Sequence, residues 1–222
     1  MRRGYFYGVL LFVTACCLPA ARAQSNFDLN IGFGTAHDSS NGLGLDNLNS
    51  ALNPLGPCNP NGLDPNCEKT GALSNFFLGF GGDVLLGKRY GFGAEVTFQP
   101  ARPDYGPLIY RQTFYDFNGI LAPINEKRVQ LQIQGGIGGS RTSFSINQSG
   151  CIGVAVACST QVVPVANANH FQIHVGVGVQ LFVTEHLFVR PQFDFHYVPS
   201  FTDQFNSTAV PGFMVWVGYG WH

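Results

Sequence analysis

The sequence predicts an all-β protein made of one eight-stranded antiparallel up-and-down transmembrane β-barrel. Hydrophobic residues make up 45% of the 222 residues and charged residues only 11%, which is too little charge for the surface of a soluble domain of this size. Apolar and polar residues alternate along much of the chain, as in strands with one apolar face. No segment beyond the N-terminus reaches about 18 uninterrupted apolar residues, the length of a transmembrane helix. A closed barrel is the other structure that pairs every backbone polar group inside a bilayer.

The N-terminal residues have the features of a secretory signal peptide. Two arginines precede an apolar stretch over residues 5–18, and Ala-Arg-Ala at 21–23 forms an A-x-A cleavage site. We therefore expect a signal peptide over residues 1–23 and a barrel domain over residues 24–222. The alternative is cleavage before Cys16 with lipidation of that cysteine, because the preceding residues resemble a lipoprotein processing box.

The predicted strands follow from the alternation. It is clearest in His170–Leu181, where every odd position is apolar and every even position is polar or glycine. Val129–Gly138 and Phe27–Gly34 follow a similar pattern. Most segments of this kind exceed the roughly nine residues with which a tilted strand crosses a bilayer. The eight predicted strands cover residues 26–35, 72–86, 90–99, 109–121, 128–144, 168–183, 187–198 and 209–221.

The connections between these strands alternate in length. Three are short, at residues 87–89, 122–127 and 184–186. Four are longer, at residues 36–71, 100–108, 145–167 and 199–208. Short periplasmic turns and longer external loops are typical of outer-membrane barrels. A soluble β-sandwich would also alternate, but it would need a more highly charged exterior than this chain can supply.

The alternation assigns each side chain to a face of the barrel. The residues predicted to face lipid are Phe27, Leu29, Ile31, Phe76, Leu78, Phe80, Phe92, Val96, Phe98, Tyr115, Phe117, Leu131, Ile133, Ile173, Val175, Val177, Phe193, Phe195, Phe213, Val215 and Val217, with Tyr90, Tyr197, Tyr219 and Trp221 at the interfaces. The residues predicted to face the lumen are Asp28, Asn30, Asn75, Asp83, Glu95, Thr97, Gln99, Gln112, Asp116, Asn118, Gln130, Gln132, Gln134, Gln172, His174, Gln180, Arg190, Gln192, Asp194 and His196.

The lumen is expected to be a hydrogen-bonded polar core, because eight strands leave an interior just wide enough for its own side chains. The predicted network residues are Asp28, Asp83, Glu95, Asp116, Gln134, His174, Arg190, Asp194 and His196. Symmetric turns at 87–89 and 184–186 would place Gly81 opposite Glu95, Gln180 opposite Arg190, Gly176 opposite Asp194, and His174 opposite His196.

Two sharper interpretations of this lumen stay open. The carboxyl groups could form a path for cations or protons. His174, His196 and Asp194 could hold zinc, although no spacing motif supports a metal site. Ordinary hydrogen bonding is favoured, and the sequence predicts neither a metal nor a cofactor.

Four cysteines would remain after removal of the signal peptide, an even number that predicts disulfides in an exported protein. Cys58 and Cys67 fall in the first long connection, and Cys151 and Cys158 in the third. Four cysteines allow three connectivities, of which the pairs Cys58–Cys67 and Cys151–Cys158 close the shortest loops.

The last predicted strand carries a family resemblance. Phe213, Val215, Val217, Tyr219 and Trp221 alternate along it, and this strand resembles the aromatic signal that the barrel-assembly machinery reads. The signal usually ends on the aromatic residue, whereas here His222 follows. With its eight predicted strands, the chain resembles the small outer-membrane barrels of the OmpA membrane domain and OmpX type.

The resemblance implies location in the bacterial outer membrane, contact with outer-membrane lipid and lipopolysaccharide, and insertion by periplasmic chaperones and the barrel-assembly machinery. It also implies a monomer. The net charge of −1 provides no basic surface for nucleic acid.

Three functions are compatible with such a barrel. The first is a non-enzymatic membrane protein with a structural, adhesion or surface-exposure role through disulfide-stapled external loops. The second is a narrow channel or small-solute carrier of the OmpW type. The third is a lipid A-modifying enzyme. A PagL-type deacylase carries a His-x-Ser pair, but neither His170, His174 nor His196 is followed by serine two residues later, which argues against such a triad. A PagP-like palmitoyl transferase has no compact motif and stays an alternative, but we predict a protein without enzymatic activity.

Overall fold

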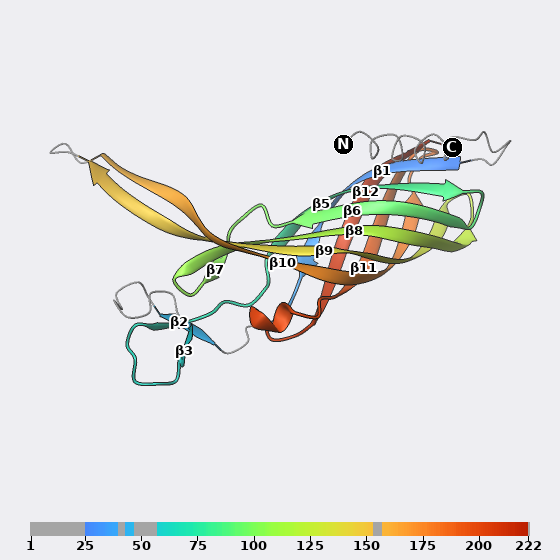
Figure 1. The fold of residues 1–222 in the computed structure, drawn as a ribbon. Helices are drawn as coiled ribbons and strands as arrows, with labels where there is room; N and C mark the ends of the chain where they lie inside the picture. The colour runs from blue at the N-terminus through green and yellow to red at the C-terminus, as the bar shows by residue number, and fades with distance from the viewer. Residues whose placement is uncertain (1–24, 40–42, 47–56, 153–156, 222) are drawn as a thin grey trace, which may run out of the picture.

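A computed structural model describes residues 25–39, 43–46, 57–152 and 157–221, and within these residues the dominant element is a closed antiparallel sheet (Figure 1). The strands of its ring are β1 (Ser25–Ala36), β5 (Phe76–Leu86), β6 (Tyr90–Phe98), β8 (Leu108–Asn125), β9 (Val129–Ile152), β10 (Ala157–Phe182), β11 (Leu187–Tyr197) and β12 (Ala209–Trp221). Each strand pairs with its neighbour along the ring, and β12 pairs with β1 from Phe27↔Trp221 to Ala36↔Gly212. The predicted eight-stranded up-and-down barrel is confirmed.

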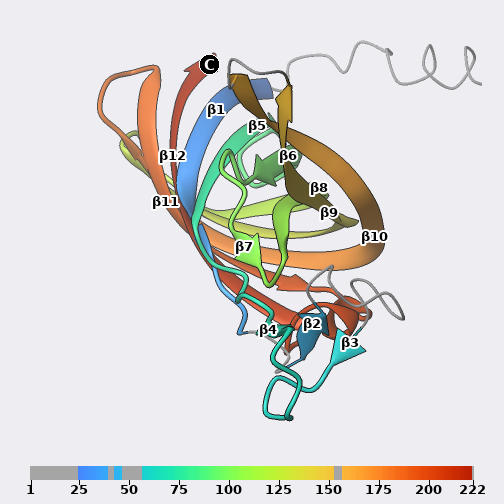
Figure 2. The same ribbon diagram turned by 90° about the vertical axis from the view of Figure 1, so that its left-hand side faces the viewer.

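The two ends of the barrel differ in structure. The turn end carries the short connections at residues 87–89, 126–128 and 183–186, together with the C-terminal end of β12. The loop end carries the two-residue strand β7 (Asp104–Tyr105), the 3-10 helix η1 (Phe201–Asp203) and a small sheet. Figure 2 views the ring from the loop end, with β7 in front of the opening and the small sheet to one side. No helix in the described part of the chain is long and apolar enough to cross a membrane.

The small sheet occupies part of the long connection between β1 and β5. It consists of β2 (Gly44–Asp46), β3 (Pro57–Cys58) and β4 (Cys67–Lys69), and β2 lies between the other two strands. The Cys58–Cys67 disulfide joins β3 to β4. One of the two predicted disulfides that close the shortest loops, Cys58–Cys67, is therefore present.

The prediction of a loop over residues 145–167 is wrong, because most of these residues belong to strands. Pairing of β8 with β9 ends at Ile109↔Ser145, and pairing of β10 with β11 begins at Ile173↔Tyr197. Beyond these points β9 and β10 continue to pair with each other as far as Ile152↔Ala157, and they project from the barrel as a two-stranded ribbon (Figure 1). The β-branched residues on both strands suit an extended backbone.

The second predicted cysteine pair lies in this ribbon. Cys151 and Cys158 are directly opposed in the strand register. Their side chains lie outside the described residues, so the Cys151–Cys158 disulfide stays a prediction.

The outer surface of the barrel is an apolar belt. Each residue predicted to face lipid is half-buried or exposed, including Phe117 at 68% and Phe92 and Ile31 at 56%. The five alternating residues predicted to form the assembly signal lie on this outer face of β12. An apolar belt of this extent is unusual for a soluble protein and is the surface that a bilayer requires.

The prediction that Asn75 faces the lumen is wrong. Asn75 is exposed and precedes β5, with a φ angle of 113°. Its side-chain oxygen accepts a hydrogen bond from the Phe76 backbone N–H at 2.8 Å. Asparagine tolerates positive φ better than most residues, and here it turns the chain into the strand instead of belonging to it.

A charge placed on the lipid face should destabilise the barrel. Phe117→Arg exchanges an outward phenyl group on β8 for a guanidinium, and we expect it to lower the free energy of unfolding by about 2–4 kcal/mol. Urea titration of the chain folded into lipid vesicles measures this quantity. The control is Leu63→Arg, at a fully exposed position outside the ring, with an expected change within about 0.5 kcal/mol. Equal effects of the two substitutions would contradict the lipid-facing assignment.

Candidate functional site

The interior of the barrel contains the residues predicted as a polar network. All nine are at most 6% exposed. They are Asp28 on β1, Asp83 on β5, Glu95 on β6, Asp116 on β8, Gln134 on β9, His174 on β10, and Arg190, Asp194 and His196 on β11. Strand alternation directs every one of them inward, since residues two apart on a strand share a face.

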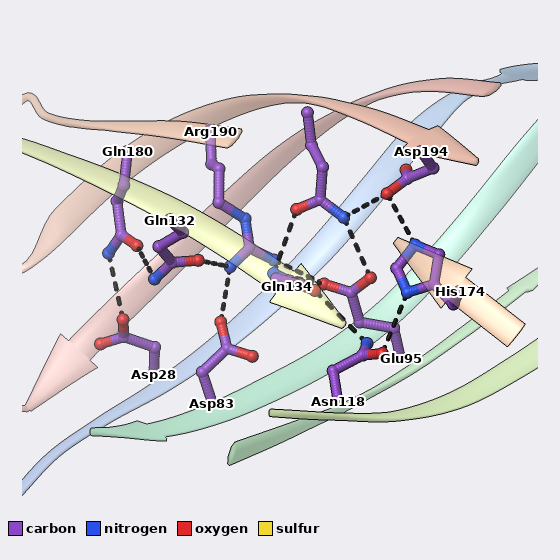
Figure 3. Close-up of polar contacts among 11 residues, drawn as sticks. Asp28, Asp83, Glu95, Asn118, Gln132, Gln134, His174, Gln180, Arg190 and Asp194 are labelled. Atoms are coloured by element: carbon purple, nitrogen blue, oxygen red, sulfur yellow. Dashed lines mark hydrogen bonds and ion pairs between the residues drawn. The ribbon is translucent and has the colours of Figure 1, made fainter. Parts of the chain in front are cut away.

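Arg190 is the centre of this network (Figure 3). Its Nη1 donates to Asp83 Oδ2 and to Gln132 Oε1, each at 2.5 Å, and its Nη2 donates to Glu95 Oε1 at 2.8 Å. The guanidinium carbon also lies 5.6 Å from the centre of the Trp216 ring. The arginine therefore joins three strands of the ring and stacks against a fourth.

Glutamine side chains extend the network towards the turn end. Gln132 Nε2 donates to Gln180 Oε1 at 2.9 Å, and Gln180 Nε2 donates to Asp28 Oδ2 at 3.0 Å. An amide both donates and accepts, so it can link one acceptor to the next. The sequence placed these glutamines in the lumen, but alternation alone did not indicate that they connect Arg190 to Asp28.

A second group of side chains surrounds His174. Its Nε2 lies 3.0 Å from Asp194 Oδ1, and its Nδ1 lies 3.0 Å from Asn118 Oδ1. The His196 ring is stacked between His174 and Phe114, with centroid separations of 4.8 and 4.4 Å. Asp116 Oδ2 lies 4.0 Å from His196 Nδ1. The two histidines and two acids thus form one contiguous cluster.

Three of the four pairings predicted across the short turns are confirmed. Gly81 is opposite Glu95, Gly176 is opposite Asp194, and His174 is opposite His196. The pairs on either side of Gln180, Gly178↔Gln192 and Leu181↔Val189, keep the same register. Short turns allow little slippage, which is why counting from their centres placed these residues correctly.

The prediction of a polar core throughout the lumen is only partly correct. Apolar side chains fill both ends of the interior. At the turn end these are Leu85, Ile120 and Phe188, each at most 3% exposed. At the loop end an aromatic cap closes the barrel; it consists of Tyr105, Tyr110, Phe114, Phe144, Phe201 and Phe205. Loop residues supply part of this cap, and strand alternation could not have placed them.

The aromatic cap is held in place by polar contacts outside the membrane. The Tyr105 hydroxyl donates to the Gln204 carbonyl oxygen, and burial raises the pKa of Tyr105 to about 12, so the hydroxyl keeps its proton. Asp38 Oδ2 accepts a hydrogen bond from the Ser207 N–H at 3.1 Å, and the Ser39 carbonyl accepts one from the Asn206 N–H at 3.0 Å. The loop that carries Phe201 and Phe205 is therefore tied to the segment that follows β1.

The charge inside the barrel is unbalanced. Among the described residues of the lumen, five carboxylic acids face one arginine. Arg190 contacts two of these acids, Asp83 and Glu95. Buried carboxylates need partners, because removal from water disfavours the charged form. The hydrogen bonds from glutamines and from the histidine cluster supply part of this requirement.

The fold and its lumen define a class of protein: a small, closed, membrane-spanning β-barrel. The family model of the outer membrane protein beta-barrel domain matches residues 8–220. The chain belongs to this family, and its location is the bacterial outer membrane.

Solved structures with this fold come from several bacteria. The chain is similar to Ail, the attachment invasion locus protein of Yersinia pestis, solved in complex with the heparin analogue sucrose octasulfate, with 10% identity and a TM-score of 0.50 over 89% of this chain and 99% of Ail. It is also similar to Neisserial surface protein A, with 13% identity and a TM-score of 0.50 over 87% of this chain and 95% of that protein. These likenesses concern the fold alone. No curated protein sequence matches the chain.

Removal of the central arginine should destabilise the barrel strongly. Arg190→Met leaves Asp83 and Glu95 buried without their cation, and we expect a loss of about 3–5 kcal/mol in the free energy of unfolding. Urea titration in lipid vesicles measures the loss. The triple variant Arg190→Met, Asp83→Asn, Glu95→Gln removes the three charges together and should recover part of the stability. No recovery in the triple variant would contradict the role of Arg190 as the counter-ion of these acids.

Proposed function

We propose that this protein is a non-conducting, non-enzymatic outer-membrane barrel that presents its loop end at the cell surface in a structural or adhesion role. The observation that carries the proposal is the filled lumen. Polar side chains joined by hydrogen bonds occupy its middle, and apolar residues occupy both ends. A solute would have to displace both the aromatic cap and the Arg190 network to pass.

The loop end has the structure that a surface role requires. The β9–β10 ribbon extends beyond the barrel, and the disulfide-stapled β2–β4 sheet lies at the same end, apart from the ribbon (Figures 1 and 2). On the ribbon, Val162 and Val165 are 44% and 45% exposed. Rigid, projecting loops on a stable scaffold are the usual location of binding surfaces.

Biogenesis follows from the same proposal. Residues 1–23 act as the signal peptide; they lie outside the described residues. The outward aromatic rings of Tyr219 and Trp221 make an edge-to-face contact with centroids 4.7 Å apart, and Trp221 stacks on Phe27 at 5.5 Å. This aromatic group supports an assembly signal for the barrel-assembly machinery, with delivery by periplasmic chaperones. We further propose that the chain works as a monomer in contact with lipid and lipopolysaccharide.

The enzymatic alternative is less well supported by the lumen. His174 and His196 point into the barrel, away from the lipid in which an acyl chain would lie. The His196 ring is held between two aromatic rings. Neither arrangement resembles a base beside a nucleophile at the lipid surface.

The orientation of the barrel can be tested by chemical labelling. Arg102→Cys places a thiol in the exposed connection at the loop end, and Lys88→Cys places one in a turn at the other end. A membrane-impermeant maleimide added to intact cells should label the first variant and leave the second unlabelled until the cells are lysed. Labelling of the Lys88→Cys variant alone on intact cells would reverse the orientation and contradict the surface role.

The channel alternative rests on one observation: a small cavity lies below the aromatic cap, lined by Glu95, Asp116 and Asp194. Conductance in planar bilayers separates the two functions. We expect no repeatable single-channel steps from the intact chain, because the cap and the network close the lumen in series. Repeatable cation-selective steps would favour the narrow channel. A variant with Phe201→Ser and Phe205→Ser serves as the matched comparison, and its behaviour indicates whether the cap or the network is the main barrier.

A further inference from the structure

Three potential metal ligands converge below the aromatic cap. Glu95 on β6, His174 on β10 and Asp194 on β11 are each at most 4% exposed. One ligand atom from each lies within 4.8 Å of the other two. Figure 3 shows the three side chains beside one another at one end of the network. They come from three strands, so only the closed barrel brings them together.

The hydrogen bonds of His174 prepare its Nε2 as a ligand. Asn118 Nδ2 donates to Gln134 Oε1 at 3.3 Å, which directs the Asn118 oxygen towards His174. That oxygen lies 3.0 Å from His174 Nδ1 and can only accept, so Nδ1 carries a proton. Nε2 lies 3.0 Å from Asp194 Oδ1, so a protonated ring pairs with this carboxylate. Loss of the Nε2 proton exposes a lone pair directed towards Asp194, and a bound cation would take the place of that proton.

The carboxylate ligands are also oriented by neighbouring side chains. Gln192 Nε2 donates to Asp194 Oδ1 at 2.7 Å and to Glu95 Oε2 at 3.1 Å. Arg190 Nη2 donates to Glu95 Oε1 at 2.8 Å. Partners of this kind hold the ligands of known metal sites in position and are part of their affinity.

There is space for an ion beside these ligands. A cavity of about 10 Å³, the size that holds a single water molecule, is lined by all three residues and by Asp116 and His196. Gly176 keeps the site open, because a Cβ atom there would lie 2.9 Å from Asp194 Oδ1 and 3.4 Å from His174 Nε2.

An unpartnered ligand atom borders the same cavity. His196 Nδ1 is buried and has no hydrogen-bond partner, although an unsatisfied buried nitrogen carries a free-energy cost. Its nearest carboxylate oxygen, Asp116 Oδ2, is 4.0 Å away. Asp116 accepts a hydrogen bond from Gln172 Nε2 through its other oxygen, Oδ1, and both Asp116 and His196 line the cavity in which an ion would lie.

We propose that Glu95, His174 and Asp194 bind one divalent transition-metal ion inside the barrel, where Asp116 and His196 line the same cavity. One imidazole nitrogen and two carboxylate oxygens suit zinc and its neighbours better than calcium or magnesium, which prefer oxygen alone. The ion also offsets the excess of five lumen acids over one arginine. It acts as a structural ion that joins β6, β10 and β11.

Zinc titration of the folded chain in detergent micelles tests the site. After treatment with a chelator, calorimetry should detect one equivalent of Zn²⁺ bound. His174→Gln and Asp194→Asn should each weaken binding on the order of 100-fold. Asp28→Asn, at the turn end of the same network, and His186→Asn, on the exposed turn, are the controls and should leave binding unchanged.

Two results would overturn the proposal: failure of the wild-type chain to bind an equivalent of Zn²⁺, or binding that is unaffected in both ligand variants. Heat-dependent mobility on a detergent gel verifies that each variant has folded. If a ligand variant does not fold, Co²⁺ added to the wild-type chain decides instead. Paramagnetic broadening of the His174 ring signals supports the site, whereas broadening confined to His37, His170 or His186 contradicts it. The conductance result has no bearing on this outcome.

Discussion

Closure of the sheet between β1 and β12 is the constraint on which the rest of the structure depends. Inside a bilayer every backbone N–H and C=O needs a partner within the protein, and a sheet satisfies this only when it has no free edge. The paired residues from Phe27↔Trp221 to Ala36↔Gly212 remove that edge. Once the ring is closed, each strand has one face in lipid and one in a narrow lumen, and the character of both faces follows.

The narrow lumen explains the composition of the inner face. A ring of eight strands encloses little more than its own side chains, so polar groups there must satisfy one another. Arg190, Gln132 and Gln180 form a continuous chain of donors and acceptors from Glu95 to Asp28. Large residues fit only beside small ones: Trp216 lies against Gly32, where a Cβ atom would be 2.5 Å from the indole ring. Packing and hydrogen bonding together fill the interior apart from the small cavity below the aromatic cap.

The part of the molecule outside the bilayer is not restricted to a closed ring of strands. Beyond the bilayer the strands no longer need two neighbours, so β9 and β10 separate from the ring and continue as a ribbon. The loop after β11 folds inward and places Phe201 and Phe205 over the lumen. There Phe205 packs on Tyr105, Tyr110 and Phe201. The same end of the barrel therefore both closes the interior and presents structure outside the membrane.

The amino-acid sequence by itself determined the class of fold, the eight membrane strands and the face of nearly every side chain on them, because a strand repeats every two residues. It also determined pairings across short turns, such as His174 with His196 and Gly81 with Glu95. Only the tertiary structure decided which inward residues meet across the lumen. Arg190 contacts Asp83, which is 107 residues away along the chain, and Glu95 lies near His174 and Asp194. The stagger of the strands around the ring sets the height of each residue along the barrel axis, and tertiary contacts set the path of the long loops. A two-residue repeat in the sequence predicts neither the stagger nor the loop path.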